Sequence, residues 1–227
     1  MPKNNDNVQT HMKEICEIFA QTIKSPRSEL ENFSDYYFLI AVVMSAQTTD
    51  VQVNKVINKL YEKYPTIDDL INLGEENLAK EISSIGLYRN KAKNVIALLK
   101  ILKEKFNGHV PNSREDLESL PGVGRKSANV VLNELFHQPT IAVDTHVFRL
   151  CHRIGFSQGN TPEQVEKDLE KIIPEKYKPD ISNFLVLHGR YVCKARNPDC
   201  ENCKISRFCL ENLILSFLTS SPFTYIS

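Results

Sequence analysis

The sequence lacks the features that would carry a protein into or across a membrane. No apolar run reaches the roughly 18 residues that a membrane-spanning helix needs. The first residues, MPKNNDNVQTHMKE, contain no apolar core of a secretory signal. The hydrophobic and charged fractions, 41% and 25%, are those of an ordinary soluble chain. We therefore expect a cytoplasmic protein without a signal peptide.

The sequence also lacks net charge, because 28 basic side chains balance 28 acidic ones. Neutrality alone counts against a nucleic-acid partner, but the charges are segregated along the chain. Residues 86–105 carry six Lys or Arg against Glu104 alone, and residues 186–209 carry five against two acidic side chains. Residues 62–81 are acidic, with six Asp or Glu against two Lys. This pattern permits a nucleic-acid-binding face and equally fits ordinary solvated helix faces.

Runs of alternating short strands with hairpin turns are absent as well. Apolar side chains instead recur at helical spacing, as at 53, 56, 57 and 60 and at 95, 98, 99 and 102. Glycine and proline separate these segments. Thr49 with Gln52, and Thr161 with Gln164, have the spacing of capping boxes that start helices. The sequence therefore predicts an all-α fold.

Residues 113–135 predict two short helices joined by a glycine turn. Ser113 can cap the first helix, Pro121 ends it, and Gly122 with Gly124 allows a tight turn into the second. Backbone N–H groups at the start of that second helix are then unencumbered by Cβ atoms, which is the geometry of a phosphate site. The alternative is a simple corner between helices in which the glycines serve packing.

Lys126 lies in the first turn of that second helix. A cation there opposes the helix dipole, at a cost of roughly 0.3–1 kcal/mol where it is exposed. The same dipole disfavours the charged form of the amine, and imine chemistry needs a neutral amine. The alternative is a lysine that contacts phosphate and has no covalent role.

Asp144 follows an apolar run and precedes a helical pattern. It is therefore expected to cap the helix that follows. An N-cap carboxylate is also rigidly held, which suits a partner in proton transfer. The two roles are compatible.

Cysteine is scarce except near the C-terminus. Cys16 and Cys151 stand alone, and we expect both to be small buried apolar residues. The other four have the spacing C-x6-C-x2-C-x5-C: Cys193, Cys200, Cys203 and Cys209. Four thiols this close in an intracellular chain favour a metal centre over disulfides. Zinc and an iron–sulfur cluster both accept four cysteines, so the ligand set leaves both open.

Four segments together resemble the endonuclease III family: LPGVGRKSANVVLN at 120–133, VDTHVFR at 143–149, VMSAQTTD at 43–50 and IGLYRNKA at 85–92. The resemblance extends over about residues 13–209. It implies two helical lobes with the active site in the cleft between them. A six-helix lobe would span 24–136, with its helix-hairpin-helix at about 113–135. An iron–sulfur lobe would combine 1–23 with 137–211, and the tail at 212–227 carries no motif that matches.

The resemblance implies a base excision repair enzyme, a DNA N-glycosylase that is also an abasic-site lyase. Lys126 matches the nucleophile that attacks C1′ and forms a Schiff base, and Asp144 matches the carboxylate that handles protons and stabilises charge at the sugar. Strand cleavage then follows by β-elimination. The implied partner is double-stranded DNA with a damaged base, expected to be an oxidised pyrimidine, or with an abasic site. The enzyme would be a monomer of the bacterial type, associated with the nucleoid.

The resemblance also implies DNA contacts and a cofactor. Gln47 and Leu87 match residues that enter the duplex where a nucleotide is flipped out; their local patterns alone favour a polar helix start and a turn hydrophobe. The further expected contacts are Gly122, Val123, Gly124, Arg125, His146, Lys194 and Arg196. With no Trp in the chain, any stacking falls to Tyr or Phe. The four clustered cysteines would hold one [4Fe–4S] cluster with a structural and DNA-positioning role, zinc being the alternative.

Two other classes of protein share parts of this pattern. A non-catalytic helix-hairpin-helix module needs the glycine turn but neither Lys126 nor Asp144. An iron–sulfur electron carrier needs the cysteines but not the hairpin. Within the glycosylases, an adenine-mismatch enzyme would resemble this chain but usually lacks the lysine and carries a further C-terminal domain. The joint presence of Lys126, Asp144 and the cysteines favours the bifunctional enzyme.

Overall fold

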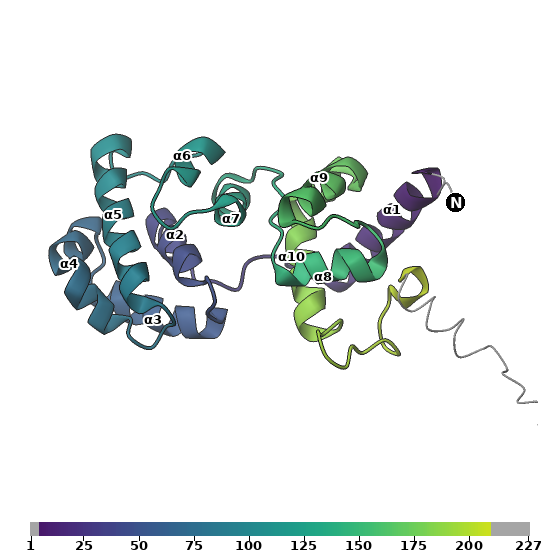
Figure 1. The fold of residues 1–227 in the computed structure, drawn as a ribbon, viewed down its shortest axis with the longest axis horizontal. Helices are drawn as coiled ribbons and strands as arrows, with labels where there is room; N and C mark the ends of the chain where they lie inside the picture. Colours follow the sequence, from purple (N-terminus) through teal and green to yellow (C-terminus); the bar gives the residue numbers. More distant parts are fainter. Residues whose placement is uncertain (1–4, 210–227) are drawn as a thin grey trace, which may run out of the picture. The chain divides into compact units, whose positions relative to one another are not determined.

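The computed structural model describes residues 5–209, and over these residues it is entirely helical, as the sequence predicts (Figure 1). Ten α-helices and two short 3-10 helices are present in this part of the chain, and no strand. The tail at 212–227 lies outside the described residues. The described part of the chain divides into two compact units, one of residues 5–27 with 141–209 and one of residues 28–140.

The unit of residues 28–140 is built from six helices. These are α2 (Asp35–Met44), α3 (Asp50–Lys63), α4 (Ile67–Glu81), α5 (Tyr88–Phe106), α6 (Arg114–Glu118) and α7 (Arg125–Phe136). Helix α4 is interrupted at Gly74, where the backbone leaves helical geometry. Helix α2 is the centre of the unit, because every residue from Tyr37 to Met44 is buried. It packs against α3, α5 and α7, as expected for a helix that is apolar all round.

The other unit contains the two ends of the described chain. Its elements are α1 (Asn5–Thr22), α8 (Thr145–Ile154), α9 (Pro162–Ile172), η1 (Glu175–Tyr177), α10 (Lys178–Tyr191) and η2 (Ser206–Phe208). Helices α8 and α10 pack together, and α8 buries Val147, Leu150, Cys151 and Ile154 on one face. None of the helices in residues 5–209 combines the length and the apolar character needed to cross a bilayer.

The helix caps follow the sequence only in part. Thr49, Ser113 and Thr161 each accept a hydrogen bond from the amide three residues on, as predicted. The return bonds of capping boxes are missing at Thr49 and Thr161, because Gln52 donates to Ser84 and Gln164 accepts from the amide of Asn160. A complete capping box forms instead at the start of α4, between Thr66 and Asp69.

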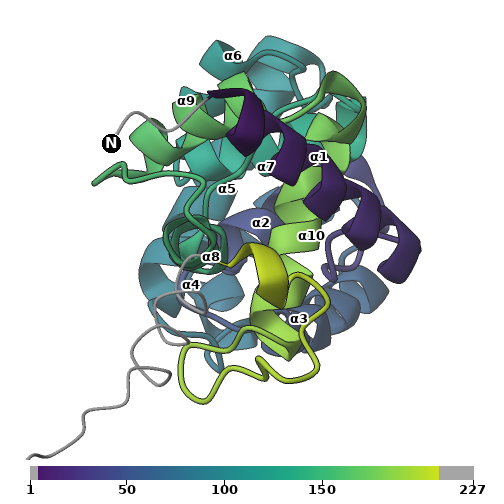
Figure 2. The same cartoon turned by 90° about the vertical axis from the view of Figure 1, so that its right-hand side faces the viewer.

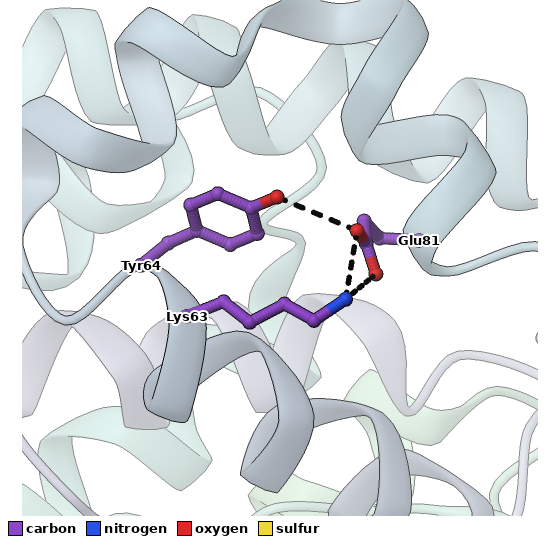
Figure 3. A network of polar contacts seen from close by, with 3 residues as sticks. All are labelled: Lys63, Tyr64 and Glu81. Carbon is purple, nitrogen blue, oxygen red and sulfur yellow. Dashed lines mark hydrogen bonds and ion pairs between the residues drawn. The ribbon is translucent and has the colours of Figure 1, made fainter.

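The connection between α3 and α4 is held by polar contacts from several sides. Lys63 Nζ lies 3.0 Å from both carboxylate oxygens of Glu81, and the Tyr64 hydroxyl lies 3.4 Å from Oε1 (Figure 3). The hydrogen bond to Glu81 raises the pKa of Lys63. From α2, the Tyr37 hydroxyl donates to the Tyr64 carbonyl at 2.6 Å and the Tyr36 hydroxyl to the Pro65 carbonyl at 2.5 Å. Exposed ion pairs contribute little to stability, so the buried Tyr37 bond is the important one.

We predict that Tyr37→Phe lowers the free energy of unfolding by about 1–3 kcal/mol, because it removes the donor of a buried side chain from the partly buried carbonyl of Tyr64. Tyr36→Phe is the matched control, since Tyr36 is only half-buried and water can replace its hydroxyl; its cost should be about 0.5 kcal/mol or less. Urea denaturation of the two variants measures both values. Equal losses would show that burial does not distinguish the two bonds.

Candidate active site

The glycine turn between α6 and α7 depends on Gly122. Its φ of 82° lies in the left-handed region, which side chains rarely adopt. A Cβ at this position would also lie 3.0 Å from Asn94 Nδ2 and 3.1 Å from Val43 Cγ1. Gly122 is therefore required both by the turn and by the packing of the hairpin on α5 and α2.

Gly124 is not required by the turn, so that part of the sequence prediction is wrong. Its φ of −99° is accessible to any residue, and a Cβ built on it would have no heavy atom within 4 Å. Gly124 is the N-cap of α7, where a Ser, Thr or Asp would bond the free amides and stabilise the helix. A glycine at this position leaves those amides open to a group from outside the chain.

Lys126 is exposed in the first turn of α7, one residue after Arg125. No acidic side chain lies in that turn to balance its charge. The cation thus stands at the positive end of the helix dipole beside an uncapped N-terminus, as the sequence predicts. Nothing in the packing of α7 explains a lysine here, because the helix buries Ala128, Val131 and Leu132 on its other face.

Asp144 is the N-cap of α8, which confirms that part of its predicted role. Its Oδ1 accepts hydrogen bonds from the amides of His146 and Val147, both at 2.8 Å. Its Oδ2 accepts none from the described residues of its own unit, so one oxygen fixes the carboxylate and the other is free for chemistry. Asp144 is half-buried. It belongs to the unit of α8, and Lys126 to the unit of α7.

Gln47 and Leu87 occupy two neighbouring loops at the starts of α3 and α5. Both have left-handed backbones, with φ of 55° and 58°. Both are exposed, and Leu87 is 57% exposed although it is a large apolar residue. The loops are adjacent, because a Cβ on Gly86 would lie 3.8 Å from the Gln47 carbonyl oxygen. The structure thus brings together two residues that are 40 positions apart in the chain, and nothing in the sequence signals their backbone geometry.

Lys91 is a residue of this region that sequence reasoning missed. In the sequence it is one of six basic residues within 86–105, a pattern that fits either a nucleic-acid-binding face or solvated helix faces, but only 5% of it is exposed. Its Nζ donates to the Ala46 carbonyl at 2.7 Å and to Thr48 Oγ1 at 2.8 Å. Burial lowers its pKa. The position of Lys91 within IGLYRNKA is the one sequence feature that connects it with Leu87.

The four clustered cysteines belong to residues 193–209, in the segment that turns back after α10 (Figure 2). Arg153 Nη1 lies 3.4 Å from Cys193 Sγ, and Cys209 Sγ donates to the Arg153 carbonyl at 3.3 Å. Burial raises the pKa of the Cys203 thiol, and electrostatic interaction with the other three thiols of the group acts in the same direction. Within residues 5–209, no three His, Cys, Asp or Glu side chains approach closely enough to share one metal ion.

The first cysteine loop is fixed by two arginines of α8. Arg153 donates to the carbonyls of Lys194 at 2.8 Å and Ala195 at 3.2 Å, and Arg149 to that of Cys193 at 2.9 Å. The side chains of Lys194 and Arg196 are exposed, as predicted for residues that face DNA. His146 is half-buried, and its Nδ1 lies 3.4 Å from Arg149 Nη2.

The remaining cysteines and a histidine are structural. Cys16 and Cys151 are buried, as the sequence predicts, and burial raises the pKa of each to about 12. His188 lies under the cysteine segment, with Nε2 3.5 Å from Cys203 Sγ, and burial lowers its pKa to about 4. Thiols that stay protonated at neutral pH are poor nucleophiles and poor metal ligands. Cys16 and Cys151 are therefore best explained as buried core residues.

Known proteins resemble this chain over most of its length. Residues 40–175 match the family model described as the HhH-GPD superfamily of base excision DNA repair proteins. Endonuclease III of Rickettsia felis is 52% identical over 198 residues, which cover 87% of this chain and 93% of that protein. Endonuclease III of Escherichia coli is 51% identical over 196 residues, with 86% and 93% covered.

Solved structures agree with the sequence relatives. A trapped covalent intermediate of endonuclease III with DNA has a TM-score of 0.86 and 42% identity, and covers 92% of this chain and 98% of its own. A non-covalent endonuclease III–DNA complex gives a TM-score of 0.87 with the same identity and coverage. A thermostable thymine-DNA glycosylase shares the fold at 24% identity, with a TM-score of 0.80. The chain therefore belongs to the endonuclease III family of HhH-GPD base excision DNA repair proteins.

Proposed function

We propose that this chain excises damaged bases from double-stranded DNA and then cleaves the abasic site, as a monomeric DNA N-glycosylase and abasic-site lyase of the cytoplasm. Oxidised pyrimidines are the proposed lesions. The observation that carries the proposal is the exposed Lys126 beside the open, glycine-capped N-terminus of α7. Membership of the endonuclease III family supports it, and one relative in that family has been trapped covalently on DNA.

Base excision needs a nucleophile and a proton acceptor. The neutral amine of Lys126 attacks C1′, the new N–C1′ bond replaces the bond to the base, and the base leaves with the electron pair and takes up a proton. The carboxylate of Asp144 accepts a proton from the attacking amine and stabilises positive charge at the sugar. The nitrogen lone pair then forms the C1′=N bond of the protonated Schiff base while the C1′–O4′ bond breaks, and O4′ takes up a proton to become a hydroxyl.

Strand cleavage follows from the Schiff base by β-elimination. A proton leaves C2′, its electron pair forms the C2′–C3′ double bond, and the C3′–O bond breaks so that the phosphate departs. The iminium nitrogen is the electron sink, and the step involves no net oxidation or reduction. Hydrolysis of the imine then returns the free amine of Lys126.

The hairpin and the two left-handed loops would position the DNA. The start of α7 at Gly124, which has no side-chain cap, suits a backbone phosphate together with Gly122, Val123 and Arg125, because a helix start attracts anions. Gln47 and Leu87 would fill the gap left by the flipped nucleotide, at an unstacking cost of a few kcal/mol. His146, Lys194 and Arg196 would add contacts from the unit that carries Asp144, the last two as exposed cations near phosphate.

The cysteine segment fits a [4Fe–4S] cluster, one per chain, held by Cys193, Cys200, Cys203 and Cys209. The guanidinium of Arg153 beside Cys193 suits a thiolate, and Cys203 lies among the other three thiols. The spacing C-x6-C-x2-C-x5-C resembles the [4Fe–4S] signature of the endonuclease III family, which favours the cluster over zinc. When bound, the cluster supplies cross-linking of the loop that presents Lys194 and Arg196.

Lys126→Ala should lose all borohydride-dependent trapping on duplex DNA with one abasic site, because no amine remains to form the imine that borohydride reduces. The exposed Lys100→Ala serves as the matched control and should trap like the unaltered enzyme. Denaturing gels that separate the covalent adduct from free protein provide the measurement. Wild-type trapping by Lys126→Ala would overturn the proposed nucleophile.

Asp144→Asn should separate proton transfer from helix capping. The amide oxygen still accepts from His146 and Val147, so the free energy of unfolding should change by less than about 1 kcal/mol. The rate of trapping should nevertheless fall about 10²–10⁴-fold, because the amide takes no proton. Asp144→Ala, which removes the cap too, should additionally lose about 0.5–2 kcal/mol of stability. A wild-type rate for Asp144→Asn would reduce Asp144 to a structural cap.

The cofactor assignment predicts about four iron atoms and four inorganic sulfides per chain in protein purified without oxygen. Cys200→Ser should lose most of the iron, because it removes a ligand that is already exposed. Cys151→Ala removes a buried thiol outside the group and should keep the iron. Metal analysis decides the question, and one zinc per chain without iron would contradict the cluster.

A further inference from the structure

Lys91 is a buried cation that stability does not explain. Only 5% of Lys91 is exposed, which makes it one of the most buried charged residues in the unit of residues 28–140. Its ammonium has no carboxylate partner in that unit. Both of its side-chain hydrogen bonds go to neutral acceptors, the Ala46 carbonyl and Thr48 Oγ1. Removing an ammonium from water without an opposite charge is costly, and an apolar side chain of the same length would fill the space more cheaply.

The two acceptors of Lys91 stand on either side of Gln47. A hydrogen bond to residue 46 and another to residue 48 bracket the left-handed backbone of the residue between them. Left-handed geometry costs roughly 1–2 kcal/mol for a residue with a Cβ, so it persists only where the surroundings fix it. The ammonium of Lys91 supplies two such constraints on this short loop.

Lys91 also contacts the second left-handed residue through its backbone. Its amide donates to the Leu87 carbonyl at 3.0 Å, in the first turn of α5. Leu87 is the N-cap of that helix and has no side-chain hydrogen bond of its own. One residue therefore connects the loop of Gln47 with the loop of Leu87.

We propose that Lys91 is a positioning residue, which holds the Gln47 loop against the start of α5 so that Gln47 and Leu87 enter the duplex together. This inference rests on the proposed function, since it takes both residues to occupy the gap left by a flipped nucleotide. Lys91 itself would not touch DNA. Loss of the Lys91 ammonium would therefore slow the reaction on duplex DNA, where Gln47 and Leu87 must enter a base stack, and would not slow it on a single strand, which has no such stack.

The role can be tested by comparing duplex with single-stranded substrates. A duplex with an abasic site requires the gap to be filled, whereas an abasic site in a single strand offers the same C1′ to Lys126 without a stack to interrupt. Lys91→Met keeps the stem and removes only the ammonium. Lys100→Met is the matched control, because Lys100 is an exposed lysine of the same helix, about 14 Å farther along it.

We expect Lys91→Met to slow single-turnover borohydride trapping on duplex abasic DNA by at least about tenfold and to leave trapping on the single strand within about twofold. 2-Aminopurine placed opposite the abasic site should brighten less on binding the variant than on binding the wild type, because fewer complexes fill the gap. Urea denaturation should show no loss of stability. Lys100→Met should match the wild type in every measurement.

Equal rates on duplex DNA for Lys91→Met and wild type would overturn the inference, and so would equal losses on both substrates, which indicate a general defect. If Lys91→Met fails to fold, Thr48→Val removes one acceptor alone and should show the same duplex-specific loss at smaller size, with Thr48→Ser restoring the rate. Absence of that loss would also refute the role of Lys91. Failure of the wild type to trap either substrate would instead refute the proposed function.

Discussion

The unpaired amides at the start of each helix are the constraint on which the proposed site depends. About four N–H groups have no partner within the helix and need one elsewhere. Helices α3, α4, α6 and α9 meet this need with Ser or Thr caps. Helices α5 and α7 begin at Leu87 and Gly124 without a side-chain cap. Each gives up about 1 kcal/mol of stability. The start of α5 carries Leu87 and the start of α7 carries the glycine turn, both among the proposed DNA contacts; α2 and α10 also begin without a side-chain cap.

The starts of α5 and α7 carry positively charged side chains, whereas helix stability favours negative charge at a helix start. Anions stabilise a helix N-terminus and cations oppose it, yet the first turns of α5 and α7 contain no acidic residue. Lys91 and Lys126 stand there instead, one buried against the neighbouring loop and one exposed. Helix α8 is the exception among the functional elements, because Asp144 caps it with one oxygen and keeps the other unbonded within its unit. The proposed nucleophile therefore lies at a helix start that has no side-chain cap, whereas the proposed proton acceptor is itself the cap of its helix.

Features set by neighbours in sequence could be predicted, and features set by distant contacts could not. The all-helical fold, the cap at Ser113 and the N-cap role of Asp144 all follow from local spacing. The burial of Lys91 depends on acceptors 43 and 45 residues away, so its local spacing does not distinguish it from the exposed basic residues around it. The positive φ of Gln47 and Leu87 has no counterpart in residue type, since neither is a residue that favours it.

Residues that stability fails to explain identify the proposed site more sharply than motifs do. Gly122 is accounted for by its φ and its packing, so its place in the motif says little about DNA. Neither backbone conformation nor packing requires a glycine at Gly124. Leu87 destabilises the fold twice, because its backbone is left-handed and because its apolar side chain is exposed to water. Lys91 and Lys126 likewise oppose the dipoles of their helices. A chain selected for folding alone would replace all four, so their joint presence on one unit is best explained by a ligand that approaches it from outside.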